Sequence, residues 1–242
     1  MLQTEKSALE QRECQYEQTL QKHLENGVQI LSRPVWIDPQ VRIAPGAQIL
    51  PGTILRGDTV VGPGCVVGPY SLLEDAVLGE NCRVNASQVY QSTLGSGTQV
   101  GPFAHVRPGT STGGQVHLGA FVETKNSDIG QGTSVSHLTY VGDSDVGEYC
   151  NFGCGTVTSN YDGDQKHRCT VGDYAFIGCN TNLIAPVTVG AGSYTAAGST
   201  ITDPVPEGAL AIARSRQQNK PGWAQRKLAG YRAKKQKLKE GR

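Results

Sequence analysis

Small aliphatic residues recur at every sixth position over most of this chain. One row runs through Ile43, Ile49, Leu55, Val61, Val67 and Leu73, and a later one runs through Val171, Ile177, Leu183 and Val189. A helix repeats at 3.6 residues and an alternating strand at 2, so neither explains a step of six. A hexapeptide period indicates a parallel β-helix, in which three short strands and their turns make one triangular coil. We therefore predict an all-β, left-handed parallel β-helix over residues 36–203, with roughly nine coils.

The composition agrees with this prediction. The chain has 31 Gly among 242 residues, but only four Phe, one Met and two Trp. Small side chains suit a narrow prism, and Gly or Asn suits its turns. A β-sandwich whose aliphatic residues have this spacing by accident is the alternative, and six consecutive matches in the first row argue against it.

Two flanking segments lie outside the repeat. Residues 1–35 contain a stretch without Gly or Pro, residues 5–26, which predicts one helix that caps the prism and ends at Asn26-Gly27. His23 is expected to be exposed on this helix. Residues 204–242 form a basic tail, because Arg214 to Arg242 hold eleven Lys or Arg and one acid, whereas residues 1–213 carry a net charge of −9. After Trp223 we expect a mobile, solvated end.

Nothing in the sequence predicts a membrane span or a secretory signal. The seven cysteines include no Cys-x-x-Cys pair, so neither a disulfide framework nor a structural zinc site is expected. A zinc site of three histidines is possible in this kind of fold, but His105, His117 and His137 offer no closely spaced pair, and we predict no metal. Reduced thiols indicate a cytoplasmic protein.

The longest break in the repeat, residues 158–170, is where a functional loop is expected. Histidine is the most natural general base at neutral pH, and His137 lies at a turn between two coils. For any single histidine a structural role is the starting assumption. The sequence has no phosphate-binding Gly-rich loop, dinucleotide fingerprint or nucleophile elbow.

Several longer stretches resemble one enzyme family. GPFAHVRPG, GAFVETKNSDIGQGTSVSHLTYVGD and NFGCGTVTSNYDGDQKHRCTVGD are similar to the C-terminal acetyltransferase domain of the bifunctional GlmU enzymes, and so are LIAPVTVGAGSYTAAGSTIT, ALAIARSRQ and NKPGW. The uridylyltransferase half of that family has no counterpart in this sequence. The resemblance implies transfer of an acetyl group from acetyl-CoA to the amine of glucosamine 1-phosphate. The product, N-acetylglucosamine 1-phosphate, would serve UDP-N-acetylglucosamine and cell-wall precursor synthesis. The resemblance also implies a homotrimer with sites between neighbouring prisms.

The resemblance assigns roles to individual residues. His137 matches the general base and Glu123 the group that orients it. The remaining acceptor contacts that it implies are Arg107, Lys125, Tyr140, Asn151, Asn160, Tyr161 and Lys166. Cationic groups at 107 and 125 suit a sugar phosphate.

The resemblance places the acetyl-CoA contacts at Cys154, Cys179, Ala197 and Arg214, and the backbone N–H of Cys154 would bind the thioester oxygen. The family usually has Ala at position 154 and Ser at 179. Both cysteines are small, so binding should survive, and they are expected to make the enzyme sensitive to alkylation. Two alternatives stay open: an acyltransferase for another phosphorylated or nucleotide-linked amino sugar, and a non-catalytic β-helix scaffold whose tail binds polyanions without specific nucleic-acid recognition.

Overall fold

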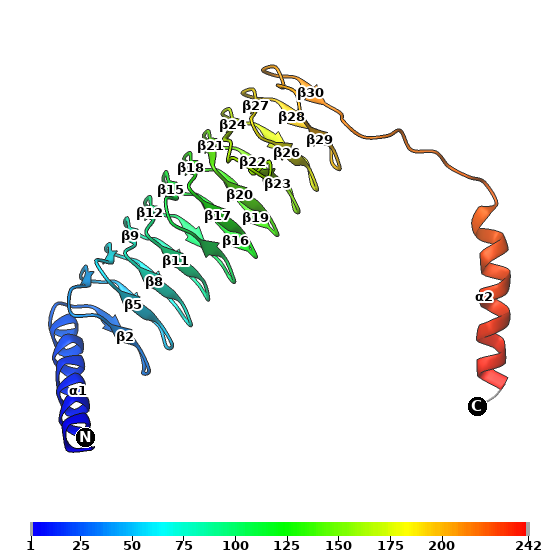
Figure 1. Cartoon of the computed structure of the whole chain (residues 1–242). Helices are drawn as coiled ribbons and strands as arrows, with labels where there is room; N and C mark the ends of the chain where they lie inside the picture. Colours follow the sequence, from blue (N-terminus) through cyan, green and yellow to red (C-terminus); the bar gives the residue numbers. More distant parts are fainter. Residues whose placement is uncertain (1, 241–242) are drawn as a thin grey trace.

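The chain forms a three-sided prism of short parallel strands, with one helix near each end of the chain (Figure 1). The computed structural model describes residues 2–240, without the side chains of residues 2–9 and 226. Each strand pairs with the strands one full coil away: Leu55 lies opposite Ile37 on one side and Leu73 on the other. The β-helix predicted from the six-residue period is confirmed.

The strands form three parallel sheets, one for each side of the prism. The 11-stranded sheet contains β1 (Gln29–Ile30), β4 (Gln48–Ile49), β7 (Val66–Val67), β10 (Arg83–Val84), β13 (Gln99–Val100), β16 (His117–Ala120), β19 (Ser134–His137), β22 (Asn151–Phe152), β25 (Phe176–Ile177), β28 (Tyr194–Thr195) and β30 (Leu210–Ala211). The 10-stranded sheet contains β2 (Trp36–Ile37), β5 (Ile54–Arg56), β8 (Leu72–Glu74), β11 (Gln88–Tyr90), β14 (His105–Val106), β17 (Glu123–Lys125), β20 (Tyr140–Gly142), β23 (Val157–Ser159), β26 (Asn182–Ile184) and β29 (Thr200–Ile201). The 9-stranded sheet contains β3 (Arg42–Ile43), β6 (Val60–Val61), β9 (Val77–Leu78), β12 (Thr93–Leu94), β15 (Ser111–Thr112), β18 (Asp128–Ile129), β21 (Ser144–Val146), β24 (Cys169–Val171) and β27 (Val187–Val189).

The strand ladder is longer than the six-residue period suggests. It begins at β1 and ends at β30, so paired strands occur both before residue 36 and after residue 203. The aliphatic residue of each hexad points inward, and Ile49, Leu55 and Val61 from three successive sides are buried completely or almost so. Since successive residues of a strand face opposite ways, the neighbouring residue of each strand lies on an outer face. The outer faces are therefore where functional side chains can emerge.

The three edges of the prism are built from tight turns with positive φ. Edge 1, from the 11-stranded to the 10-stranded sheet, includes Tyr70, Phe103, Phe121, Leu138, Gly155, Asn180 and Gly198 at φ between 45° and 77°. Edge 2, from the 10-stranded to the 9-stranded sheet, includes Gly57, Asp75, Gln91, Gly109, Asn126 and Asp143 at φ between 40° and 79°. Edge 3 closes each coil. Many of these positions hold residues other than Gly, which indicates that stacking between coils offsets the backbone strain.

Helix α1 (Leu2–Glu25) lies at the start of the prism (Figure 1). It ends at Gly27, whose φ of 80° allows the Val28 N–H to bond the His23 carbonyl oxygen at 3.0 Å, as a Gly-terminated helix requires. Leu20 and His23 are both 3% exposed. The capping role of the helix is confirmed, but the expected exposure of His23 was wrong, because its face of α1 covers the first coil.

The basic tail also differs from expectation. Residues 212–222 contain no helix or strand, and α2 (Trp223–Glu240) follows them apart from the prism (Figure 1). The end is exposed to solvent, as predicted, but it is helical, which its Ala, Lys, Gln and Leu favour as good helix formers. Among the residues described, no helix is long and apolar enough to cross a membrane.

Candidate functional site

The outer face of the 10-stranded sheet carries a row of predicted acceptor contacts. Glu123 and Lys125 are the two outward residues of β17, and about 7 Å separates two such positions on one strand. Glu123 lies in register with Tyr140 of the next coil, and Lys125 with Gly142. The Arg107 N–H donates to the Thr124 carbonyl oxygen at 2.8 Å, which places Arg107 one coil before Lys125. These residues share one face, as the hexapeptide spacing predicts.

Arg107 and Glu123 form an ion pair across two coils. Arg107 Nη1 donates to Glu123 Oε1 at 2.7 Å, and both side chains are about 40% exposed. Glu123 was expected to orient His137, but in the single chain its carboxylate is engaged by Arg107. An exposed pair of this kind adds little to stability, about 1 kcal/mol at most. It does keep the guanidinium on the outer face.

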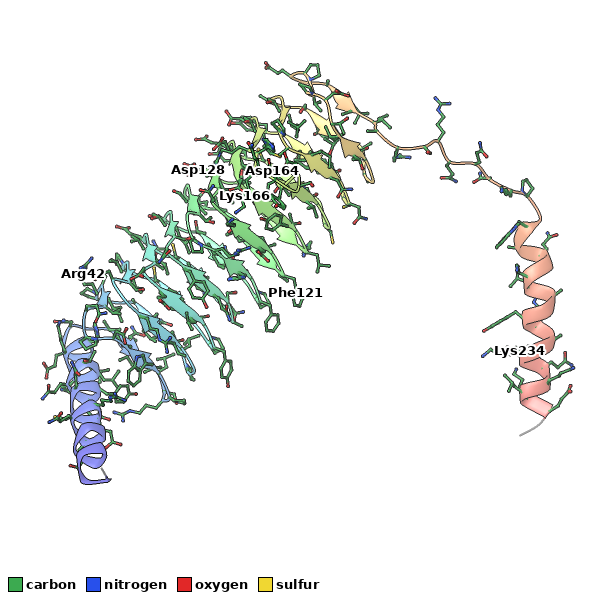
Figure 2. All side chains as sticks on the ribbon, in the orientation of Figure 1. Arg42, Phe121, Asp128, Asp164, Lys166 and Lys234 are labelled. Atoms are coloured by element: carbon green, nitrogen blue, oxygen red, sulfur yellow. The ribbon has the colours of Figure 1, made fainter. Side chains whose placement is uncertain are left out.

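Lys166 reaches the same face from the loop of residues 160–168, which leaves the prism at edge 2 between β23 and β24. Figure 2 shows Lys166 on this side of the prism. Lys166 lies near Lys125, and its ammonium group, then burial, then the repulsion between the two charges lower the pKa of Lys125. Arg107, Lys125 and Lys166 thus form a cationic cluster towards edge 2, as the sequence predicted for a phosphate.

Within the loop, Asp162 caps the turn. Its carboxylate accepts the backbone N–H of Asp164 at 2.8 Å and of Gln165 at 2.7 Å, and lies 2.7 Å from His167 Nε2. The Gln165 N–H contributes most, followed by His167 and the Asp164 N–H, to holding the pKa of Asp162 far below its usual range. Tyr161 is exposed, and its hydroxyl donates to the Gly163 carbonyl oxygen at 2.6 Å. The break in the repeat is thus a structured hairpin.

His137 lies at the opposite side of the same face, on edge 1. It ends β19, pairs with Ala120 of the preceding coil and is exposed. Cys154, Cys179 and Ala197 occupy the matching position in the next three coils. The Asn180 N–H bonds the Cys154 carbonyl oxygen and the Gly198 N–H bonds that of Cys179, both at 2.8 Å. The predicted base and three predicted acetyl-CoA contacts therefore line one edge.

Arg214 closes this line at the end of the prism. A Cβ added at Gly198 would lie 3.7 Å from Arg214 Cδ, so the arginine stem packs beside the edge-1 turn that follows Ala197. Among the residues described, the backbone N–H groups of Cys154, Cys179 and Ala197 donate to no backbone carbonyl. They form a row of free donors along edge 1, which can meet a carbonyl oxygen or other acceptor groups of an extended ligand.

Asn151 is separate from the other predicted acceptor contacts. It is exposed on the 11-stranded sheet, where it pairs with Ser134 and Phe176. Edge 1 lies between its face and that of Lys125. A single chain thus distributes the predicted site over two faces.

Sequence reasoning missed a buried carboxylate. Asp143 is 4% exposed at edge 2; Asn126 Nδ2 donates to its Oδ1 at 2.5 Å, and Asn160 Nδ2 donates to its Oδ2. Burial opposes ionisation, but these two hydrogen bonds and the charges of Lys125 and Lys166 outweigh it, so the pKa of Asp143 is lowered. The run VGDSD gave no signal for this, since an acid at a turn is ordinary.

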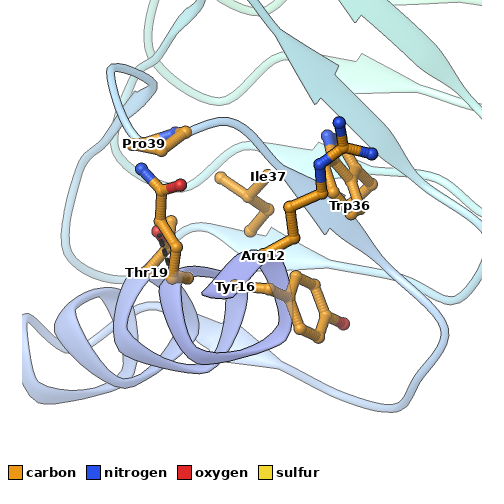
Figure 3. A pocket seen from close by; sticks show the side chains of 7 residues that line it. Arg12, Tyr16, Thr19, Trp36, Ile37 and Pro39 are labelled. Atoms are coloured by element: carbon orange, nitrogen blue, oxygen red, sulfur yellow. Dashed lines mark hydrogen bonds between the residues drawn. The ribbon is translucent and has the colours of Figure 1, made fainter. Parts of the chain in front are cut away.

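The hollows of the single chain lie away from this site. One of about 220 Å³ lies between α1 and the first coil (Figure 3), where Arg12, Tyr16 and Thr19 face Trp36, Ile37 and Pro39. The candidate site is an open face beside an edge, so it would need another surface to exclude water. Within residues 2–240, with the undescribed side chains set aside, no group of three or more His, Cys, Asp or Glu comes together to hold a metal.

Comparison with known proteins covers most of the chain. Residues 168–203 match the family model described as bacterial transferase hexapeptide (six repeats). The bifunctional protein GlmU of Clostridium acetobutylicum is 50% identical over 208 residues, which cover 86% of this chain and 46% of that protein. GlmU of Clostridium perfringens strain SM101 is 53% identical over 206 residues, which cover 85% and 45%. The chain spans about half the length of these relatives, and the resemblance found in its sequence is confirmed.

Proposed function

We propose that this relative of the GlmU proteins is an acetyl-CoA-dependent N-acetyltransferase that acetylates the amine of glucosamine 1-phosphate. Identity of about 50% over most of the chain supports the reaction. The geometric observation that carries the choice of acceptor is one face with Arg107, Lys125 and Lys166 towards edge 2 and His137 at edge 1. Such a face suits a small molecule with a phosphate at one end and an amine at the other.

The acceptor is proposed to lie across the 10-stranded sheet. Its phosphate contacts the three cations, with Tyr140 and Asn160 beside the sugar and Tyr161 near the acetyl group. The phosphate then competes with Glu123 for Arg107, which frees the carboxylate to orient His137. Arrival of the acceptor would in this way prepare the base, since an unprotonated amine is needed for attack on a thioester.

His137 is proposed to take a proton from the acceptor ammonium. The amine nitrogen then forms a bond to the acetyl carbonyl carbon and the carbon–sulfur bond breaks. The second proton that the nitrogen loses passes to the departing CoA thiolate, which leaves as the free thiol. The Cys154 N–H stabilises the oxygen that becomes negative during the attack. Cys179, Ala197 and Arg214 hold acetyl-CoA along edge 1. The reaction is a direct transfer, without an acyl-cysteine intermediate.

A homotrimer is proposed because edge 1 presents an unpartnered apolar line. Tyr70, Phe103, Phe121 and Leu138 are 58–76% exposed, and Phe103 stacks on Phe121 at 5.4 Å. Apolar surface of this kind marks an interface in a soluble protein. Another prism laid against edge 1 would cover His137 and supply a second face, such as the one that carries Asn151. We also propose a cytoplasmic location, which fits seven free cysteines.

An acceptor panel tests the proposed function. The purified protein is incubated with acetyl-CoA and several amino sugars, with and without phosphate, while the release of free thiol is followed. Glucosamine 1-phosphate should be turned over fastest. Rapid turnover of unphosphorylated glucosamine without turnover of its 1-phosphate would refute the assignment. Turnover of another phosphorylated or nucleotide-linked amino sugar alone would support the alternative of an acyltransferase with a different acceptor. No thiol release with any acceptor would favour a non-catalytic scaffold.

A further inference from the structure

Asp143 occupies an unusual position among the turns of edge 2. Its φ is 46°, and its N–H donates to the Lys125 carbonyl oxygen at 2.9 Å, as in the other turns of this edge. Unlike the exposed Asn126 of the preceding coil, it is buried. The following coil has no tight turn here, because the loop of residues 160–168 begins instead. Asp143 is thus the last turn residue beneath the loop.

Both ends of the loop are attached to Asp143. At the start, Asn160 donates its side-chain amide to the carboxylate; at the end, the Cys169 N–H donates to the Asp143 carbonyl oxygen at 3.0 Å. Arg168 adds a clamp beside it: its guanidinium donates to the carbonyl oxygens of Asn126 at 3.0 Å and Ser144 at 3.1 Å. The loop's exit from the prism is therefore fixed around one side chain.

The charges of the cluster are also balanced there. Glu123 is the counterion of Arg107, whereas the charges of Lys125 and Lys166 both interact with the Asp143 carboxylate. Removal of the Asp143 carboxylate would leave the repulsion between these two ammonium groups without this counterion. The carboxylate lies beneath the loop, where it is buried and bonded by Asn126 and Asn160, so it stays ionised without competing for a ligand at the surface.

We propose that Asp143 is a positioning residue that holds the 160–168 loop against the prism, so that Asn160 and Lys166 face Lys125 across the acceptor's phosphate. The identity of the acceptor in this inference rests on the proposed function, whereas the role of Asp143 in holding the loop does not. Asp143 acts through the loop and Lys125, and it touches no reacting atom.

The first test compares Asp143→Asn with Asp75→Asn. Asp75 lies on the same edge, far from the cationic cluster, and has a similar φ of 51°. Its Oδ1 accepts a hydrogen bond from the Asp58 N–H at 2.9 Å. An Asn at 143 has one acceptor oxygen for two donors, so at least one bond is lost. In Asp143→Asn, amide hydrogen exchange in residues 160–168 should be at least about tenfold faster than in the native chain, whereas Asp75→Asn should leave it unchanged. Unchanged exchange in Asp143→Asn would overturn the inference.

Two further measurements separate positioning from a merely structural role. In reductively methylated protein, the NMR titration of Lys125, assigned by its absence in Lys125→Arg, should move to a lower pKa in Asp143→Asn, because the Asp143 charge that raises the pKa of Lys125 is lost. The KM for glucosamine 1-phosphate should rise about tenfold or more, while the KM for acetyl-CoA stays within twofold. An unchanged lysine titration, or equal rises in both KM values, would contradict the proposal.

If Asp143→Asn does not fold, Asn160→Ala removes the same bond from the loop side and should raise loop exchange in the same way; native-like exchange there would overturn the inference. A native protein that acetylates no amino sugar phosphate would refute the proposed function, yet loop exchange and the lysine titration would still decide the role of Asp143. The two failures are therefore distinguishable.

Discussion

Gly142 provides a sharp test of the face assigned to the acceptor. A Cβ at this position would lie 2.2 Å from the Tyr140 hydroxyl oxygen and 2.5 Å from its ring carbon Cζ. Gly142→Ala therefore forces the phenol to move by about 1 Å or more to restore ordinary contact. The backbone itself tolerates alanine, because Gly142 is not among the residues with positive φ. The substitution should displace one side chain and leave the coil intact.

The expected cost follows from that displacement. Misplacement of a substrate-positioning group by 1 Å can cost about 10²-fold in rate, equivalent to about 2.7 kcal/mol of transition-state stabilisation. We predict a fall of this size in kcat/KM for glucosamine 1-phosphate. The free energy of unfolding should change by only about 1 kcal/mol, since the half-buried phenol can turn towards solvent. Steady-state thiol release and thermal unfolding measure the two effects.

Gly62→Ala, far from the proposed site, is the matched control. Its Cβ would lie 2.5 Å from the backbone carbonyl oxygen of Gly79 in the next coil, which cannot turn away, so we expect a loss of about 1–3 kcal/mol in stability. A double-mutant cycle isolates the cause: in a Tyr140→Ala background, Gly142→Ala should have almost no further effect on kcat/KM. Native kcat/KM in Gly142→Ala, or additive losses in the cycle, would refute the reasoning.

Three further predictions concern other parts of the chain. Among the side chains described, none is a hydrogen-bond partner for either buried ring nitrogen of His23, and burial first, then the charge of Lys22, lowers its pKa below 6.5. The neutral His23 therefore contributes stability that is present above pH 6.5 and is lost as pH falls through the lower folded-state pKa, so the pH dependence of unfolding between 7.5 and 5 should flatten in His23→Leu, and an unaltered slope would exclude His23 as its source. Cys179 is exposed and Cys154 half-buried, so in a Cys14→Ser background a thiol reagent should modify Cys179 first. Bound acetyl-CoA should slow both the modification and the loss of activity. Equal rates with and without acetyl-CoA would show that these thiols do not line the acetyl-CoA site. Phe152 is the largest fully buried side chain among the residues described, and Phe152→Ala should lower the free energy of unfolding, measured by chemical denaturation, by about 3–5 kcal/mol. A loss below about 1 kcal/mol would mean that neighbouring side chains of the coil fill the cavity.

The architecture could be predicted from the sequence because the prism repeats one local rule. Each hexad needs one small inward aliphatic residue, such as Leu55 or Val61, and one turn, so the period alone specifies the core and the outer faces. The place of the long loop was predictable for the same reason, since residues 158–170 interrupt that rule and the structure has a loop between β23 and β24.

Features that depend on contacts between distant segments were not predictable in this way. His23 looked exposed because the helical pattern does not tell which face of α1 covers the first coil. Asp143 looked like an ordinary turn residue because its partner Asn160 lies one coil further along the chain. The pairing of Glu123 with Arg107 likewise depends on which side chains the coils place side by side, which a period of six leaves open.

The most direct test of the proposed function is the rate of thiol release from acetyl-CoA with glucosamine 1-phosphate in His137→Ala, measured beside His117→Ala. His117 is on the outer face of the 11-stranded sheet, two coils before Asn151, and is none of the proposed contacts, so it serves as the matched histidine control. If His137 is the general base, kcat should fall about 10²–10⁴-fold in His137→Ala and stay within about twofold in His117→Ala. A native kcat in a folded His137→Ala protein would contradict the account.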